Sequence, residues 1–153
     1  MSTKQIAIGC DHRGLDLKEK VKNILTTNSY TCKDVGCFTE ESVDYPDIAE
    51  LVCDSIINGE SDRGILICST GAGMSIAANK VNGIRAVLCF DSFLALRARQ
   101  HNDANVLCLA SSVNPDSLQD IVISFLTGTF EGDRHLRRID KIKAIESRNR
   151  QSC

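Results

Sequence analysis

The sequence predicts an α/β fold with a central five-stranded parallel sheet, and three observations support this prediction. Short apolar runs typical of buried strands alternate with helical stripes along the whole chain. The most strand-like run, Gly64–Cys68, is apolar throughout, as expected for a parallel strand buried on both faces. The segments between strands are long enough for helical crossovers, which are right-handed in nearly all sheets. Together they predict a three-layer, doubly wound, Rossmann-like sandwich with an additional C-terminal helix.

The elements follow one another in a regular order. The expected strands cover residues 5–9, 32–36, 64–68, 84–89 and 105–109. An apolar stripe on one helical face indicates the first helix and consists of Leu17, Val21, Ile24 and Leu25. The second helix opens at residues 42–46, where Pro46 suits a first turn, and ends at Asn58-Gly59. Further helices are expected at residues 75–80, 92–100 and 118–126, and a last one at about 134–150.

The composition is that of a single globular domain spanning residues 1–153. With 42% apolar and 25% charged residues and a formal net charge of −2, general disorder and nucleic-acid binding through overall charge are both disfavoured. The apolar runs are far shorter than the ~20 residues of a membrane span. The first residues carry no secretory signal. We therefore expect a cytoplasmic protein with no membrane partner and no nucleic-acid partner.

The last helix carries an unusual concentration of charge. The segment Arg134–Arg150 contains seven Lys and Arg residues against two acidic ones, which suggests an anionic ligand or partner. Apolar residues recur at every third position of the same segment, namely Leu136, Ile139, Ile142 and Ile145. This stripe can pack either on a partner subunit or on the chain's own sheet, and the sequence leaves both alternatives open.

Neither a disulfide framework nor a metal site is expected, despite eight cysteines. The chain has no secretion signal and no Cys-x-x-Cys pair, and most of the cysteines lie in apolar segments where thiols behave as small hydrophobic groups. The three histidines, His12, His101 and His135, stand apart in the sequence without the spacing of a zinc site.

The chemistry is expected at the carboxyl ends of the strands, because ligands of open parallel sheets bind there. This filter selects Asp11 and His12 after the first strand, and Cys68 and Thr70 at the third. The turn that follows, Ser69–Gly73, is rich in small residues and can present backbone N–H groups as an anion hole. Its alternative is a tight turn without a ligand. The turn is neither a dinucleotide fingerprint nor a phosphate-binding loop with Gly-Lys-Ser/Thr, so no nucleotide cofactor is expected.

Four further features are candidates for a functional role. Cys68 is either a base or nucleophile beside a helix start, where a thiolate is stabilised, or a buried core thiol. His101 is expected in a polar loop before the fifth strand, where a histidine is more often solvated than catalytic. Asp11 can orient the imidazole of His12. On the last helix, three arginines share one face that suits a phosphate, namely Arg134, Arg137 and Arg138.

Several segments resemble the ribose-5-phosphate isomerase type B family, which includes bacterial galactose-6-phosphate isomerase subunits. The resemblance covers nearly the whole chain. It is carried by residues 8–12 (IGCDH), 42–47 (SVDYPD), 64–68 (GILIC) with Thr70-Gly71, 73–80 (GMSIAANK), 83–86 (GIRA), 99–105 (RQHNDAN) and Arg134-His135 with Arg138.

The resemblance implies a metal-independent aldose–ketose isomerase that interconverts ribose 5-phosphate and ribulose 5-phosphate without a cofactor. Cys68 matches the family's base, and Thr70 matches the hydroxyl beside it. His101 and Asp11 match the groups that open the furanose ring. The backbone of Ser69, Gly71, Ala72 and Gly73 matches the family's hole for the enediolate. Tyr45 matches a residue that lines the sugar site. His12, Arg134 and Arg138 match the residues that bind the phosphate. The resemblance also implies a homodimer or a tetramer with active sites shared between subunits, with Asn102 in the shared wall.

The sequence departs from the family in two places. Ser69 replaces the usual Gly, which strains the turn if its φ is positive. The segment Ala110-Ser111-Ser112 lacks the Arg that often follows the fifth strand, so a phosphate contact is expected to be missing or replaced. The alternatives that remain are an isomerase of a six-carbon sugar phosphate, such as allose 6-phosphate or galactose 6-phosphate, and a non-catalytic anion-binding module.

Overall fold

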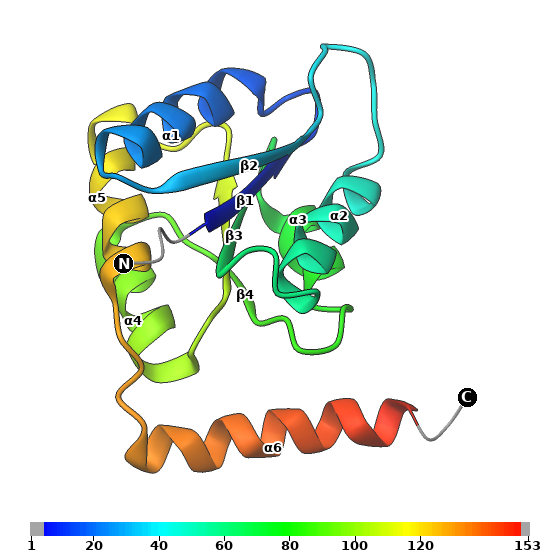
Figure 1. Ribbon diagram of the computed structural model, residues 1–153, viewed down its shortest axis with the longest axis vertical. Helices are drawn as coiled ribbons and strands as arrows, with labels where there is room; N and C mark the ends of the chain where they lie inside the picture. Colours follow the sequence, from blue (N-terminus) through cyan, green and yellow to red (C-terminus); the bar gives the residue numbers. More distant parts are fainter. Residues whose placement is uncertain (1–4, 151–153) are drawn as a thin grey trace.

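The computed structural model describes residues 5–150 and contains one five-stranded sheet whose strands are all parallel (Figure 1). The strands are β1 (Gln5–Cys10), β2 (Thr31–Gly36), β3 (Arg63–Cys68), β4 (Ala86–Leu88) and β5 (Val106–Ala110), in the spatial order β2-β1-β3-β5-β4. The helices are α1 (Leu15–Thr27), α2 (Tyr45–Ile57), α3 (Ala72–Ala78), α4 (Ser92–Asn102), α5 (Pro115–Thr127) and α6 (Asp133–Arg150). The predicted doubly wound α/β class is confirmed.

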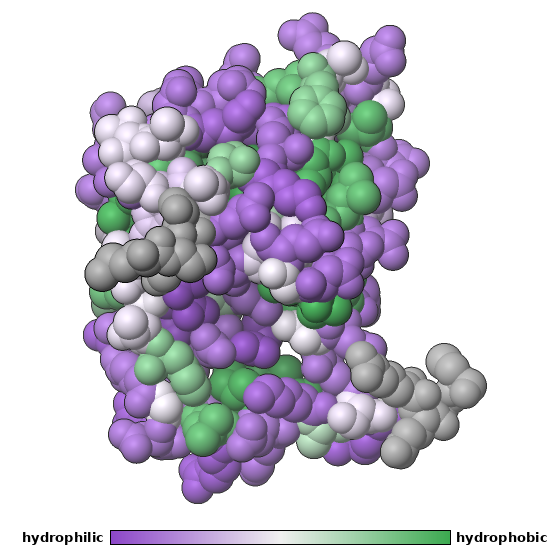
Figure 2. Space-filling model, in the orientation of Figure 1, coloured by the Kyte–Doolittle hydropathy of each residue, from purple (hydrophilic) through white to green (hydrophobic). Residues whose placement is uncertain are grey.

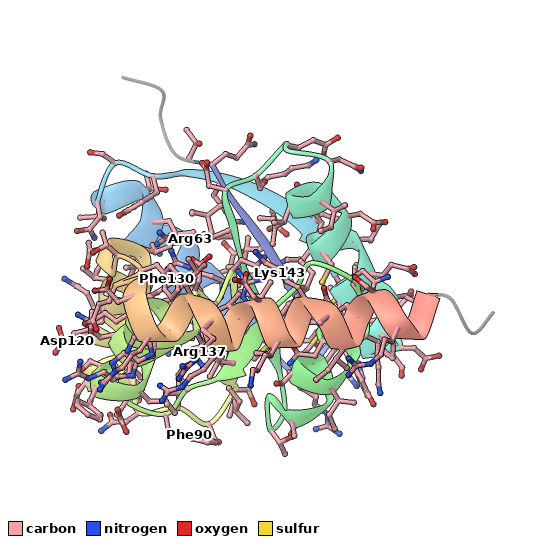
Figure 3. All side chains as sticks on the ribbon, turned by 90° about the horizontal axis from the view of Figure 1, so that it is seen from below. Arg63, Phe90, Asp120, Phe130, Arg137 and Lys143 are labelled. Atoms are coloured by element: carbon pink, nitrogen blue, oxygen red, sulfur yellow. The ribbon has the colours of Figure 1, made fainter. Side chains whose placement is uncertain are left out.

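Helices α1 to α5 form two layers on the sheet, and α6 lies separately across one end of it. Helices α1, α4 and α5 cover one face, while α2 and α3 cover the other (Figure 1). Between the layers, β1, β3 and β5 are almost completely buried, which explains their continuous apolar sequences. Helix α6 crosses the amino ends of the strands, far from the loop between β2 and α2 at the opposite end (Figures 1 and 3). None of the helices described is long and apolar enough to cross a membrane.

Several element boundaries differ from the sequence predictions. Helix α3 begins at Ala72 rather than at residue 75, because the small residues of the turn already have helical conformation. Helix α4 continues past residue 100 to Asn102, so His101 is helical and the prediction of a polar loop is wrong. Strand β4 is only three residues long, because Ile84 joins a turn with Val81 and the backbone of Arg85 bonds the side chain of Asn105.

A buried lysine anchors the loop that leads from β2 to α2. Lys18 is 1% exposed, and its Nζ donates to Asp34 Oδ1 at 2.8 Å and to the carbonyl of Cys37 at 2.5 Å. Lys22 pairs with the other oxygen of Asp34 at 2.9 Å. Although partial burial acts to raise it, the pKa of Asp34 lies below its ordinary value because both lysines donate to the carboxylate. This network ties α1 to β2 and fixes the start of the loop.

Helix α6 packs only partly on its own chain. Of its apolar stripe, Ile139 is 2% exposed and therefore buried. The other three members stay 40–50% exposed, namely Leu136, Ile142 and Ile145. Between α6, the loop before β4 and the edge of the sheet lies a cavity of about 790 Å³, lined in part by Ile142 and Ile145. Figure 2 shows apolar side chains at this hollowed boundary between α6 and the body. Intramolecular packing therefore covers only part of the stripe.

Candidate active site

Cys68 ends β3 at the carboxyl edge of the sheet and accepts a backbone hydrogen bond. Its side chain is buried, and the N–H of Gly71 donates to its Sγ at 3.2 Å. The turn reaches back to the sulfur because Gly71 adopts a left-handed conformation with φ +75°. A Cβ at this position would lie 2.4 Å from Leu88 Cδ1 and 3.0 Å from the backbone carbon of Leu109. Both the backbone angle and the available space therefore require glycine.

Four further buried cysteines, Cys10, Cys53, Cys89 and Cys108, are core thiols. Burial raises the pKa of Cys10, Cys53 and Cys89 to about 12, so these thiols stay protonated at neutral pH. Burial also raises the pKa of Cys108 well above its ordinary value. The seven cysteines in the described part of the chain are free thiols, in agreement with the prediction that disulfides are absent there. Cys153 lies outside the described residues.

The turn after Cys68 accommodates the unusual Ser69 without strain. Ser69 does not have a positive φ, because the non-glycine residues with positive φ in the described chain are Ser29, Asp103 and Asp133. The backbone strain expected at Ser69 is therefore absent. Ser111 braces the turn, because its N–H donates to the carbonyl of Cys68 at 2.9 Å and its Oγ to that of Ser69 at 3.3 Å. A residue in the segment that lacks the family's Arg thus supports the turn that carries Cys68.

Two further predicted site residues line this turn. Thr70 is exposed, and its Oγ1 accepts the N–H of Ala72 at 3.3 Å. Tyr45, the first residue of α2, lays its ring against Gly73, where an added Cβ would come within 2.7 Å of Tyr45 Cζ. Gly73 therefore allows the tyrosine to close over the start of α3, and Tyr45 itself remains 40% exposed. The expected grouping of Thr70 and Cys68 at the carboxyl edge is present, and Tyr45 lies beside it.

Asp11 and His12 lie at the same edge but do not pair with each other. The N–H of Asp11 donates to the carbonyl of Ile67 at 3.1 Å, which holds it beside β3. Its carboxylate accepts the backbone N–H of Arg13 at 2.9 Å, whereas His12 Nδ1 accepts the N–H of Val43 at 3.4 Å. The prediction that Asp11 orients His12 is therefore wrong. The loop after β2 holds the imidazole instead.

The remaining predicted residues lie at the opposite, amino edge of the sheet. His101 and Asn102 occupy the last turn of α4, just before β5, whereas Cys68 is paired with Ala110 at the far end of β5. At ~3.3 Å per residue, the length of β5 alone separates these positions by about 13 Å. Arg134 and Arg138 lie on α6, which also crosses the amino edge; Figure 3 shows their neighbour Arg137 on this helix. A single chain does not bring His101 to Asp11 and Cys68.

At the amino edge, the structure assembles a cluster that includes an acid missed by the sequence analysis. The rings of His101 and His135 stack with centroids 4.2 Å apart and planes inclined by 9°. Glu131 Oε2 lies 3.8 Å from His101 Nε2 and 3.7 Å from His135 Nε2. Arg97 Nη1 is 3.4 Å from His101 Nε2, and Arg134 Nε is 3.4 Å from His135 Nε2. Burial, the neighbouring His101 and two arginines lower the pKa of His135.

The donor set of this cluster has the composition of a metal site, but its surroundings do not favour a cation. His101, Glu131 and His135 offer three ligand atoms within 4.8 Å of one another. His101 and His135, which stand apart in the sequence, are thus brought together by the fold. Each imidazole Nε2, however, has a guanidinium nitrogen at 3.4 Å, and these positive charges repel a metal ion.

Comparison with known proteins places this geometry in a family. The model of the ribose/galactose isomerase family matches residues 6–142. The chain belongs to this family. Ribose-5-phosphate isomerase B of Escherichia coli is 44% identical over 146 residues, covering 95% of this chain and 98% of the relative. The probable ribose-5-phosphate isomerase B of Mycoplasma genitalium is 48% identical over 144 residues, covering 92% of this chain and 95% of the relative.

Solved structures of the ribose/galactose isomerase family share the fold over nearly the full length. The ribose-5-phosphate isomerase B of Clostridium thermocellum superposes with a TM-score of 0.92 at 46% identity, covering 95% of this chain and 99% of the other. The Mycoplasma genitalium enzyme, solved with bound ribulose 5-phosphate, gives a TM-score of 0.89 at 45% identity, covering 96% and 98%.

Proposed function

We propose that the protein interconverts ribose 5-phosphate and ribulose 5-phosphate, with Cys68 as the base that moves a proton between C2 and C1. The observation that carries this proposal is the Gly71 N–H that donates to Cys68 Sγ at the carboxyl edge, within the turn faced by Tyr45. A backbone donor stabilises negative charge on the sulfur. Relatives named ribose-5-phosphate isomerase B, one of them with bound ribulose 5-phosphate, support the choice of substrate.

The reaction is a proton transfer through an enediolate. With the aldose open, the Cys68 thiolate takes the proton from C2, and the electron pair moves to form the C1=C2 double bond while O1 gains negative charge. A proton then passes from the O2 hydroxyl to O1, and the negative charge moves to O2. The electron pair on O2 forms the C2 carbonyl, while the C1=C2 pair takes the proton back from the sulfur at C1. The N–H groups of Gly71 and Ala72 already bond Cys68 Sγ and Thr70 Oγ1, so we expect the other backbone N–H groups of residues 69–73, with the Thr70 hydroxyl beside them, to stabilise the oxyanion. One such donor typically contributes ~10²–10³ in rate, and a positioned base ~10²–10⁴.

We propose that the complete site forms between two copies of the chain. One copy supplies Asp11, His12, Tyr45 and Cys68 from its carboxyl edge. The other supplies His101, Asn102, Arg134 and Arg138 from its amino edge. Support comes from the position of these groups at opposite ends of one sheet, and from the exposed apolar residues of α6, which a second copy would cover. A homodimer is the simplest assembly with this property, and a tetramer of such pairs is compatible with it.

The two halves of the shared site have different tasks. His101 and Asp11 open the furanose ring: one proton leaves O1, the C1–O4 bond breaks with its electron pair going to O4, and one proton arrives at O4. Arg134, Arg138 and His12 bind the phosphate. The binding energy of this contact holds the reacting carbons over Cys68. Asn102 lies beside His101 in the wall between the copies. Free thiols are the state expected in a reducing compartment, in line with action in the cytoplasm.

A coupled assay of the purified protein tests the function. We expect conversion of ribose 5-phosphate that survives a metal chelator, and a loss of about 10²-fold or more in Cys68→Ala. Cys89→Ala is the matched control, because Cys89 is a buried thiol that the proposed site does not use. A Cys68→Ala protein of full activity would remove the thiol from the mechanism. Faster turnover of allose 6-phosphate or galactose 6-phosphate than of ribose 5-phosphate would favour the six-carbon alternative.

A further inference from the structure

The carboxylate of Glu131 lies within 4 Å of three cationic or protonatable side chains. Its Oε2 is within 3.8 Å of both imidazoles, and its Oε1 is 3.9 Å from Arg97 Nη1. The backbone of Glu131 is fixed as well, because its N–H donates to the carbonyl of Gln100 at 3.0 Å. This bond ties the loop before α6 to the last turn of α4. The backbone of Glu131 is therefore held at Gln100, the residue that precedes His101, and its carboxylate lies beside the His101 ring.

We propose that Glu131 is the positioning residue of His101 in ring opening. This inference rests on the proposed function of His101. Whichever of the two protons His101 handles, its ring alternates between a neutral and a positively charged form. The guanidinium of Arg97 lies 3.4 Å from its Nε2, and Arg134 and Arg138 act on the stacked His135. A positive charge on His101 needs a counter-charge in this surrounding, and Glu131 provides it.

The same contacts fix the orientation of the ring. His135 is 5% exposed and packs flat against His101, so one face of the His101 ring lies on a buried partner. Glu131 lies beside the Nε2 atoms of both rings, so its carboxylate ties the pair together at one edge. Rotation of His101 about its χ2 angle would break the stack and the carboxylate contact together. The imidazole is thereby held in one orientation before the sugar binds.

The test separates ring opening from proton transfer at carbon. Ribulose 5-phosphate cannot close a five-membered ring, because its C5 oxygen carries the phosphate. In D2O, exchange of its C1 proton needs Cys68 but no ring opening. For Glu131→Gln, we expect the rate with ribose 5-phosphate to fall about 10- to 100-fold, while C1 exchange stays within about 2-fold of the wild-type rate. Glu131→Asp keeps the charge and should recover part of the loss.

The controls distinguish a failure of the role of Glu131 from a failure of the proposed function. Asp140→Asn removes an exposed acid from α6 without touching the imidazoles and should leave both rates unchanged. If Glu131→Gln does not fold, Glu131→Asp serves for the same comparison of the two rates. Equal losses of exchange and conversion, or no loss at all, would refute the role of Glu131. A wild-type protein that neither converts nor exchanges the sugar phosphates would instead refute the proposed function.

Discussion

The turn at Gly71 allows a quantitative test, because the same backbone strain occurs elsewhere without crowding. Gly71→Ala forces an L side chain into φ +75° and places its Cβ 2.4 Å from Leu88 Cδ1 and 3.0 Å from the backbone of Leu109. Gly59 has nearly the same φ, +74°, and nothing within 4 Å of an added Cβ. The difference between the two alanine variants therefore isolates the steric contribution.

For Gly59→Ala, we expect a cost in the free energy of unfolding of about 1–2 kcal/mol from left-handed strain alone. For Gly71→Ala, overpacking adds typically about 1–3 kcal/mol, so the total cost is about 2–5 kcal/mol. The displaced N–H no longer reaches Cys68, and a misplacement of about 1 Å can cost roughly 10²-fold in rate.

Urea titration followed by circular dichroism measures both free energies of unfolding, and the coupled assay measures kcat. Gly59→Ala should keep its kcat, because a side chain added at Gly59 meets nothing within 4 Å. Equal destabilisation of the two variants, together with an unchanged kcat for Gly71→Ala, would show that the crowded turn does not hold the sulfur as argued.

Three further predictions concern the loop anchor and the phosphate. Lys18→Met should lower the free energy of unfolding by an amount near the lower end of roughly 3–5 kcal/mol, because Asp34 still pairs with Lys22. Lys22→Met should lower it by less than about 1 kcal/mol. Equal losses for the two variants in urea titrations would contradict this prediction. Because the folded pKa of Asp34 is lowered, its contribution is present above its unfolded pKa of about 3.9 and is lost as pH falls through the folded value. Acid titration of Asp34→Asn should then show a shallower loss of stability below about pH 4, and an unchanged slope would refute it. Arg138→Ala should raise KM for ribose 5-phosphate by about 10-fold or more with a smaller change in kcat, unlike Arg137→Ala, and equal KM values in the two variants would argue against the clamp.

Periodicity was sufficient to predict the sheet, because three of the five strands are buried on both faces and their apolar runs are unambiguous. Helix boundaries were harder to predict where small or polar residues have helical conformation. At Ala72 no apolar stripe indicates where the helix begins. At His101 and Asn102 the polar side chains resemble a loop, although the helix ends only where Asp103 turns to φ +45°.

The site was predicted in part. The carboxyl-end rule correctly brings Cys68, Thr70 and Asp11 to one edge. The same rule places His101, which precedes a strand, at the opposite edge, so the separation of His101 from Cys68 follows from strand direction alone. The contact of Glu131 with His101 had no local signal, because it depends on the path of the chain after α5 back to the end of α4.

Subunit complementation tests the shared site most directly. Cys68→Ala and His101→Asn are each expected to be nearly inactive, and they are unfolded together and refolded as a mixture. If Cys68 and His101 act from different copies, half of the dimers are mixed and one of their two sites is intact, so activity should return to about one quarter of the wild-type value. A mixture that stays as inactive as its parents, while size-exclusion chromatography shows mixed dimers, would contradict a site built from two chains.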